Sequence, residues 1–378
     1  MWEYGNPGEP APYSHTFLKR MDFTIEVVKV AVVLFGVLNL AGLLTWVERK
    51  QSAVMQDRIG ANRASIFGIR AMGLFHPLAD AAKLILKEDF VPENADRILH
   101  TLAPFAALFF ALITFAAIPF GDALEINGRE IDLQVADLNV GILYIFAMMS
   151  MGVYGVVLAG WSSNNKYSLL GGLRASSQMI SYEITMGVSI MGVIMVYNSL
   201  NLQDIVRGQG DLLLGFIPKW GVLTQPLACL LFMTAALAET KRIPFDLPEG
   251  ESEIIGYFTE YSGMKFGMFF MTDFVETVLA AALTTTLFFG GWQIPYLYRD
   301  GLHLFGTVFP LPPLLIVVLQ VLAFTLKVAF FCWFLMLIRW TLPRFRYDQL
   351  MRLGWKMMLP LSLLNIFVTG VVIMLLNA

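Results

Sequence analysis

Long runs of apolar residues, separated by shorter polar stretches, dominate this chain. A membrane-spanning helix needs about twenty mostly apolar residues, and the runs of that length predict eight spans. The spans are expected at residues 27–47, 99–120, 139–160, 177–197, 221–239, 267–291, 312–340 and 356–377. Since the apolar positions are continuous and do not alternate with polar ones, the spans should be helices and not barrel strands. The sequence predicts an all-α polytopic membrane protein.

A further apolar pattern, over residues 69–86, recurs at every third or fourth position. Its apolar members are Ile69, Met72, Phe75, Leu78, Ala82, Ile85 and Leu86. Asp80, Lys83 and Lys87 fall on another face, which is typical of an amphipathic helix lying along a membrane surface. Such a helix can serve as an anchor only, or it can form the lip of an opening for a lipid-soluble ligand.

The distribution of positive charge predicts which polar segments face the cytoplasm. Of the 26 Lys and Arg residues, 18 lie in or at the ends of segments 48–98, 161–176, 240–266 and 341–355, and 6 lie on the opposite side. Cytoplasmic loops carry the excess of positive charge, so these four segments should be cytoplasmic and both termini periplasmic.

Two features are expected on the outer side. Residues 1–24 form a polar N-terminal extension ahead of the eight-span domain of residues 25–378. Residues 124–133 place alternating apolar positions around Asn127-Gly128, which predicts a small hairpin.

Composition excludes several classes of protein. The chain is 57% hydrophobic and only 15% charged, with a net charge of −3, so no basic face is expected for nucleic acid. Two cysteines cannot hold an iron–sulfur cluster through four thiolates, and the four histidines form no pair at helical spacing. The chain is therefore expected to bind no metal and no redox cofactor itself.

Residues 238–266 form the segment with the densest chemistry. Pro244 and Pro248 interrupt any regular helix there. The acids of this segment are Glu239, Asp246, Glu249, Glu251, Glu253 and Glu260. They alternate with apolar residues such as Phe245 and Leu247, which should draw the segment into the protein and not leave it as a solvated loop. Crowded, partly buried carboxylates carry protons near neutral pH, so a proton-handling cluster is predicted.

Acids also occur inside the predicted spans. Glu183 lies in the fourth span, and Asp273 and Glu276 share a face of the sixth. A charge inside a bilayer is costly and marks a functional site by default. The alternative is a structural ion pair with a base such as Lys327 or, for Glu183, Arg174. Three such acids next to the acidic loop predict a polar path into the bilayer.

A basic segment precedes the last span. Arg339 and Lys356 are explained by topology alone, because positive charge gathers at cytoplasmic span ends. Arg344, Arg346 and Asp348 could instead pair with the acidic loop.

Seven motifs resemble those of one family. They are Glu48-Arg49-Lys50, DRIGANR at 57–63, PLADAAKLILKE at 77–88, SNNKYSLLGGLRASSQMISYEI at 163–184, AETKRIPFDLPEGESE at 238–253, TEYSGMKFGMFFM at 259–271 and PRFRYDQLMRLGWK at 343–356. In this order they resemble the quinone-site membrane subunit (the H-type subunit) of proton-pumping NADH:quinone oxidoreductase, respiratory complex I. The chain departs from the usual pattern at Ala61, His76, Lys241 and Asp273, where that family has Pro, Gln, Asn and Glu.

The resemblance implies a mechanism. Quinone, the substrate, would enter from the bilayer between the first span, the amphipathic helix and the sixth span, and would be reduced at the boundary with the peripheral arm. FMN and iron–sulfur clusters would lie on partner subunits, and carboxylates would couple reduction to proton pumping. The residues implied for the quinone chamber and proton path are Glu48, Arg49, Arg63, Asp80, Lys83, Glu183, Glu239, Asp246, Glu249, Glu251, Glu253, Asp273 and Arg344.

The implied partners are the peripheral-arm quinone-site subunits and the neighbouring membrane subunits, in a bacterial inner membrane. Two other classes remain open. One is the homologous membrane anchor of a membrane-bound hydrogenase or formate-oxidising complex. The other is a free-standing secondary transporter, which the lack of an internal repeat disfavours.

Overall fold

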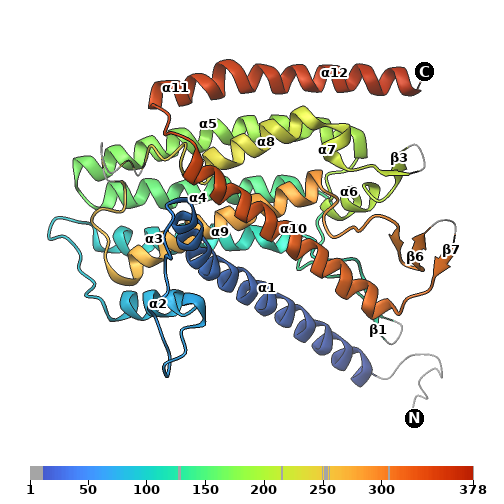
Figure 1. Ribbon diagram of the computed structural model, residues 1–378, viewed down its shortest axis with the longest axis horizontal. Helices are drawn as coiled ribbons and strands as arrows, with labels where there is room; N and C mark the ends of the chain where they lie inside the picture. Colours follow the sequence, from blue (N-terminus) through green and yellow to red (C-terminus); the bar gives the residue numbers. More distant parts are fainter. Residues whose placement is uncertain are drawn as a thin grey trace, which may run out of the picture.

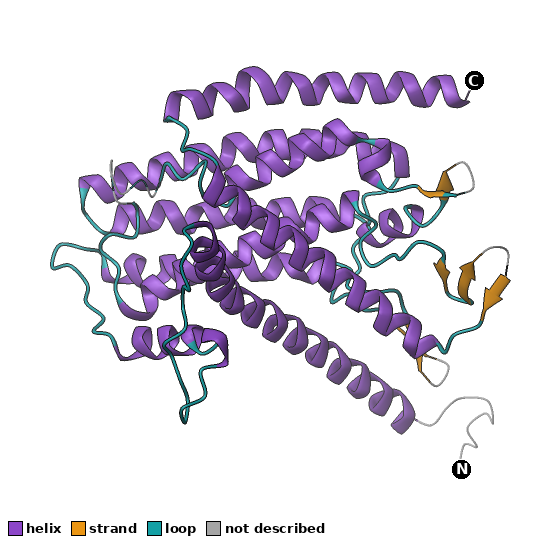
Figure 2. Cartoon of the chain, viewed as in Figure 1, coloured by secondary structure: helices purple, strands orange, loops and turns teal. Residues whose placement is uncertain are grey.

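The computed structural model describes residues 12–126, 129–213, 216–248, 250, 254, 256–304 and 307–377. Within these residues, seven helices are long and apolar enough to cross a membrane (Figures 1 and 2). They are α1 (Pro12–Met55), α3 (Arg97–Ile113, continued by a 3₁₀ turn to Ala117), α4 (Gly141–Ser162), α5 (Lys166–Tyr197), α9 (Gly263–Phe288), α10 (Pro313–Thr341) and the C-terminal helix. That last helix joins α11 (Tyr347–Arg352), a π-helical turn (Leu353–Met358) and α12 (Leu359–Asn377). The predicted fold class is confirmed: this is an all-α polytopic membrane protein.

The fifth predicted span is a broken helix. It consists of α7 (Gly221–Thr224) and α8 (Pro226–Glu239), which meet at Gln225. Pro226 disfavours helical geometry in the residue before it, and the Gln225 backbone is indeed non-helical. The buried Gln225 side chain donates to Thr369 and accepts from Asn365, both on α12. The break is therefore tied to the C-terminal helix, and α7 with α8 supplies the shorter eighth apolar segment.

The connections gather on two opposite sides of the bundle. We call one the loop side (residues 56–96, 163–165, 240–262 and 342–346) and the other the hairpin side (residues 118–140, 198–220 and 289–312). In Figure 1 the loop side is at the left, and both ends of the described chain lie at the right, on the hairpin side. An even number of spans requires this arrangement of the ends.

Short elements cover both sides. The loop side carries α2 (His76–Leu86) and a 3₁₀ turn (Ala71–Gly73). The hairpin side carries α6 (Leu202–Gly208) and three small antiparallel sheets, namely β1 (Leu124–Ile126) with β2 (Arg129–Ile131), β3 (Leu212–Leu213) with β4 (Ile217–Pro218), and β5 (Leu297–Tyr298), β6 (Gly301–Leu304) and β7 (Thr307–Phe309). The predicted hairpin is confirmed in its strands, which pair Leu124 with Ile131. Its Asn127-Gly128 turn lies outside the described residues.

Three predicted boundaries differ from the structure, because the helices do not begin where the polar residues give way to apolar ones. The segment 161–176 is mostly helical: α5 begins at Lys166, where the Asn165 side chain accepts a hydrogen bond from the Tyr167 amide and caps the helix. The segment 341–355 is helical from Tyr347 onward. The amphipathic helix is shorter than predicted, because α2 begins only at His76.

Glycines let α5 approach its neighbours closely. A Cβ on Gly171 would lie 2.9 Å from the carbonyl carbon of Gly256, and a Cβ on Gly160 of α4 would lie 2.8 Å from the Ser168 carbonyl oxygen. Small residues allow such close backbone contact between membrane helices. They press α5 against both α4 and the 240–262 loop. Figure 1 shows α1 and α10 running obliquely past the other helices, with α9 between them and the rest of the bundle.

One buried carboxylate ties the hairpin side together. Arg299 grips Asp122 with two hydrogen bonds of 2.8 and 2.9 Å, and Arg207 of α6 adds a third at 2.9 Å. The Asp122 amide donates to the side chain of Gln320 on α10. Burial alone would raise the pKa of Asp122, but the two guanidinium groups outweigh it and hold the pKa below its usual value.

Replacing Asp122 with alanine should destabilise the hairpin side by about 2 kcal/mol, since the two arginines are roughly half exposed and water takes over part of their bonding. A group whose pKa is lowered by folding stabilises the fold above its unfolded pKa and loses that contribution as the pH falls. The gap in melting temperature between wild type and variant should therefore be constant near neutrality and shrink below about pH 4. A gap that widens on acidification would contradict this explanation.

Candidate functional site

The loop end of α1 meets two arginines from distant parts of the chain. Glu48 forms an ion pair with Arg339 of α10 at 2.6 Å and accepts a hydrogen bond from Arg242 at 3.2 Å. The Arg242 guanidinium also lies 4.0 Å from the centre of the Phe274 ring on α9. One carboxylate thus joins α1, α10 and the 240–262 loop. The interpretation of Arg339 as a charge that only sets topology was wrong.

The next residue of α1 holds the amphipathic helix. Arg49 pairs with Asp80 of α2 at 2.5 Å, and Lys83 lies 3.8 Å from the other oxygen of the same carboxylate. Several apolar side chains of α2, among them Leu78 and Ile85, remain exposed in this chain. Arg63 is exposed on the loop between α1 and α2 and is not part of the buried cluster.

Asp246 lies in the 240–262 loop, which folds into the protein as its apolar residues predicted. Phe245 and Leu247 are buried, and Gln178 of α5 donates to the backbone carbonyls of Ala238 and Phe245. Asp246 is buried between them and pairs with Arg344 at 2.8 Å. The predicted pairing of Arg344 with the acidic segment is confirmed.

Burial raises the pKa of Asp246 to about 6, although the guanidinium groups of Arg344 and Arg339 oppose the shift. This carboxylate can therefore gain or lose a proton close to physiological pH.

Lys241 is the cation at the centre of the buried acids. Its side chain is 1% exposed, and its ammonium lies 3.3 Å from Asp273 and 3.1 Å from Glu276, both on α9. Burial alone would lower the pKa of Lys241, but the two carboxylates reverse the effect and hold it well above its usual value. Its backbone has a φ of 54°, a left-handed conformation that costs energy for a lysine.

Two further acids extend this cluster toward α4. Glu239, at the end of α8, is 3% exposed and lies close enough to Glu276 and Glu183 to feel their charge. One Glu239 carboxylate oxygen has no hydrogen-bond partner among the described residues. Glu183 of α5 accepts a hydrogen bond from the Ser150 hydroxyl of α4. Acids from the loop, α9, α8 and α5 are therefore buried or partly buried in the same part of the protein.

The ion pair with Lys327 that we considered as an alternative for these acids was wrong. Lys327 of α10 donates to the carbonyls of Phe289, Gly291 and Gln293, at 2.8, 2.9 and 2.8 Å. These carbonyls follow the end of α9 on the hairpin side, opposite to the loop. The ammonium therefore binds the turn that follows α9, and the acids of α9 pair with Lys241.

Of the residues expected in the site, the structure brings Glu48, Glu183, Glu239, Asp246 and Asp273 into buried or partly buried positions. It places Arg344 at the surface, paired with Asp246, and puts Arg49, Asp80 and Lys83 at the α1–α2 contact. Glu249, Glu251 and Glu253 lie outside the described residues. Lys241 and Arg242 were missed as site residues. The signal that could have identified them is their position two and three residues after Glu239, within a run otherwise rich in acids.

Comparison with known proteins assigns the family. The family described as NADH dehydrogenase matches residues 28–370. An H-type subunit of the NADH-quinone oxidoreductase of Cytophaga hutchinsonii is 45% identical, over 94% of this chain and 98% of that protein. The H-type subunit from Geobacter metallireducens is 47% identical over the same shares, and the one from Thermomicrobium roseum is 47% identical over 90% of this chain and 94% of its own length. The chain therefore belongs to the NADH dehydrogenase family, among the H-type subunits of NADH-quinone oxidoreductase.

Proposed function

We propose that this chain is the membrane subunit of a proton-translocating NADH:quinone oxidoreductase that forms the quinone chamber and couples quinone reduction to proton movement. The names and near full-length similarity of the relatives support this assignment over a hydrogenase or formate-oxidising anchor. Electrons would come from FMN and iron–sulfur clusters on peripheral subunits, as the family resemblance implies. The chain's own contribution is then to admit the quinone and to handle protons.

The opening for quinone is proposed between α1, α2 and α9. Support comes from the Arg49–Asp80 ion pair, which fastens α2 to α1, and from Leu84 of α2, whose side chain lies against Gly267 of α9. The exposed apolar side chains of α2 suit a helix at the membrane surface. We infer that the loop side faces the cytoplasm, because it carries most of the positive charge.

The buried series of acids carries the proposal. Reduction of a quinone to a quinol takes up protons. We propose that carboxylates near the loop side supply these protons. Asp246 is the member that lies in the 240–262 loop itself, and from it the proposed series continues through Asp273, Glu276 and Glu239 to Glu183. We propose that protons move along this series and that Glu249, Glu251 and Glu253 extend it toward the peripheral arm.

Asp246 offers a direct test through pH. With a pKa of about 6, this group is ionised and paired with Arg344 above that pH, and it is protonated and releases Arg344 below it. Coupled quinone reduction by the wild-type complex should therefore fall as the pH drops through about 6. Asp246→Asn should remove this inflection, as measured by NADH-driven quinone reduction and pumping in sealed vesicles. Asp348→Asn, at an exposed carboxylate paired with Arg346, is the matched control. An unchanged inflection in Asp246→Asn would overturn the role of this acid.

A further inference from the structure

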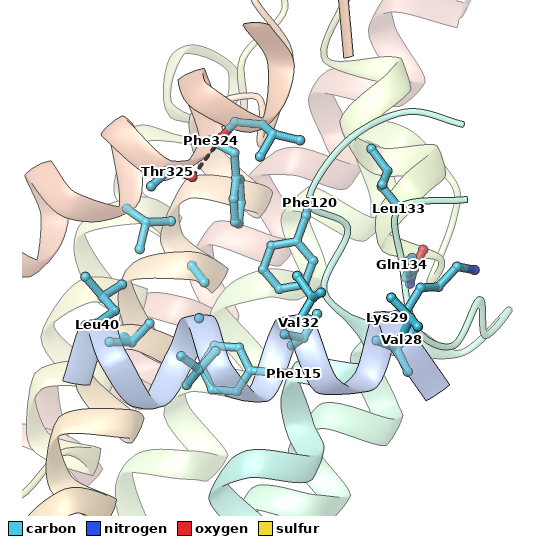
Figure 3. Close-up of a pocket in the computed structure, with 18 of the residues that line it drawn as sticks. Val28, Lys29, Val32, Leu40, Phe115, Phe120, Leu133, Gln134, Phe324 and Thr325 are labelled. Atoms are coloured by element: carbon cyan, nitrogen blue, oxygen red, sulfur yellow. Dashed lines mark hydrogen bonds between the residues drawn. The ribbon is translucent and has the colours of Figure 1, made fainter. Parts of the chain in front are cut away.

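A long apolar groove lies away from the buried acids, between α1, α9 and α10 (Figure 3). Its volume is about 590 Å³. Along α1 it extends from Thr24 to Leu40, while Val278 and Ala282 of α9 form part of its wall. Nearly all of its lining is apolar, so the groove suits a hydrocarbon.

The groove is open to the surrounding bilayer on one side. Val28 and Val32 on its rim are 54% and 64% exposed, whereas Phe115 and Phe324 at its back are 2% and 3% exposed. In Figure 3 the rings of Phe120 and Phe324 face the groove above α1. A ligand could therefore enter sideways from the membrane.

The dimensions of the groove fit one hydrocarbon chain. At about 1.5 Å per residue, the stretch of α1 from Thr24 to Leu40 is about 24 Å long. Dividing the volume of about 590 Å³ by this length gives a mean cross-section of about 25 Å². An extended hydrocarbon whose carbon atoms keep van der Waals distance from their neighbours needs roughly 20 Å². A helix about 10 Å wide needs roughly 80 Å², so a helix from a neighbouring protein could not lie wholly inside the groove.

The one charged side chain of the lining, Lys29, and the amide of Gln134 lie at the same end of the groove. Figure 3 shows Lys29 beside Gln134 at one end and Leu40 at the other. Lys29 pairs with Glu26 at 2.8 Å, and the Lys29 side chain is only 16% exposed. Glu48, at the loop side, is 19 residues further along α1, or about 28 Å. This distance along the helix is comparable to the thickness of a hydrocarbon core, about 30 Å, so we place Lys29 toward the headgroups on the hairpin side.

We propose that the groove binds one acyl chain of a zwitterionic phospholipid from the leaflet on the hairpin side, with its phosphate beside Lys29 and its ammonium beside Glu26. The pair of opposite charges matches a zwitterionic headgroup, whereas an anionic one would meet the Glu26 carboxylate. The tail of a quinone fits less well, because its headgroup belongs at the loop side and the groove has its polar end at the other. This site does not depend on the proposed function.

Photolabelling of the assembled complex tests the site. The probe is a phosphatidylethanolamine with a diazirine in its acyl chain, compared with a quinone that carries the same group in its tail. The phospholipid should label peptides from residues 24–40 and 321–328. Absence of that label, or labelling of the same peptides by the quinone alone, would overturn the proposal.

Two glycines of α1 provide a matched pair of variants. A Cβ at either Gly36 or Gly42 would meet no atom within 4 Å, but only Gly36 lines the groove. Gly36→Leu should reduce phospholipid labelling about tenfold, which corresponds to displacing about two buried methylenes. Gly42→Leu should leave labelling unchanged, and both variants should keep wild-type quinone reduction. Equal labelling of all three proteins would show that the lipid binds elsewhere.

Lys29 and Glu26 test the headgroup. Lys29→Gln should weaken labelling by the zwitterionic lipid a few fold. Glu26→Gln should shift the preference toward a phosphatidylglycerol carrying the same diazirine, because the carboxylate that repels an anionic headgroup is gone. An unaltered preference in both variants would contradict the proposed headgroup contacts.

Discussion

Replacing Glu48 with alanine should prevent most of the complex from assembling. This carboxylate forms ion pairs with Arg339 and Arg242 and so joins α1 to α10 and to the 240–262 loop. Its removal leaves two guanidinium groups without the charge they share, and breaking a buried pair in this way costs about 3 kcal/mol or more. A cost of that size lowers the ratio of folded to unfolded protein more than a hundredfold and consumes much of the stability that a protein has in hand. The yield of intact complex on a native gel and NADH-driven quinone reduction in membranes are the measurements.

Two controls separate the ion pair from a general effect of mutation. Glu48→Gln keeps the shape and one acceptor oxygen, so it should give an intermediate yield. Glu93→Ala removes an exposed acid on the same side of the protein and should assemble normally. Full assembly of Glu48→Ala would mean that these three elements are held together by other contacts.

Replacing Glu183 with glutamine should leave assembly intact and reduce proton pumping at least tenfold. Glu183 accepts from the Ser150 hydroxyl, and a glutamine carbonyl can accept the same hydrogen bond. The exchangeable proton is lost, however, and a positioned proton-transfer group typically contributes a hundredfold or more. Since reduction and pumping are coupled, quinone reduction should fall as well. The measurements are complex yield and pumping in sealed vesicles with NADH.

The outcome also separates a relay from a structural acid. If Glu183 were half of a buried ion pair, the glutamine variant would leave its partner unpaired and assembly would fail. Asp204→Asn, at an exposed acid on the hairpin side, should be normal in both measurements. Normal yield together with normal pumping in Glu183→Gln would remove this residue from the proton path.

The sequence predicted the spans well because crossing a bilayer leaves a strong hydropathy signal. Helix ends that rise out of the apolar region were missed, as at Lys166 and Tyr347, because polar residues there resemble a loop and only packing makes them helical. The break at Gln225 could have been suspected from Pro226, but the side chains of α12 that hold it come from 140 residues further along the chain.

Partners within the site were harder to predict than its acids. A carboxylate inside a span is visible in the sequence, whereas the basic residue that pairs with it depends on how the helices pack. Lys327 was the nearest candidate by position in a span, yet Lys241 from the loop is the partner of Asp273 and Glu276. The apolar groove was also invisible, because it lies between α1, α9 and α10 and depends on how these helices pack, not on any pattern in one of them.

The binding of Lys327 to the turn after α9 has a consequence for biogenesis. A lysine in the middle of a span costs roughly 2.5–3.5 kcal/mol on insertion, and here the cost is offset by three carbonyls that follow α9. Those carbonyls would themselves lack donors in the bilayer without the lysine. Neither segment therefore has all of its hydrogen-bonding groups paired when it leaves the translocon alone. We expect α9 and α10 to be released into the membrane together, as one helical hairpin.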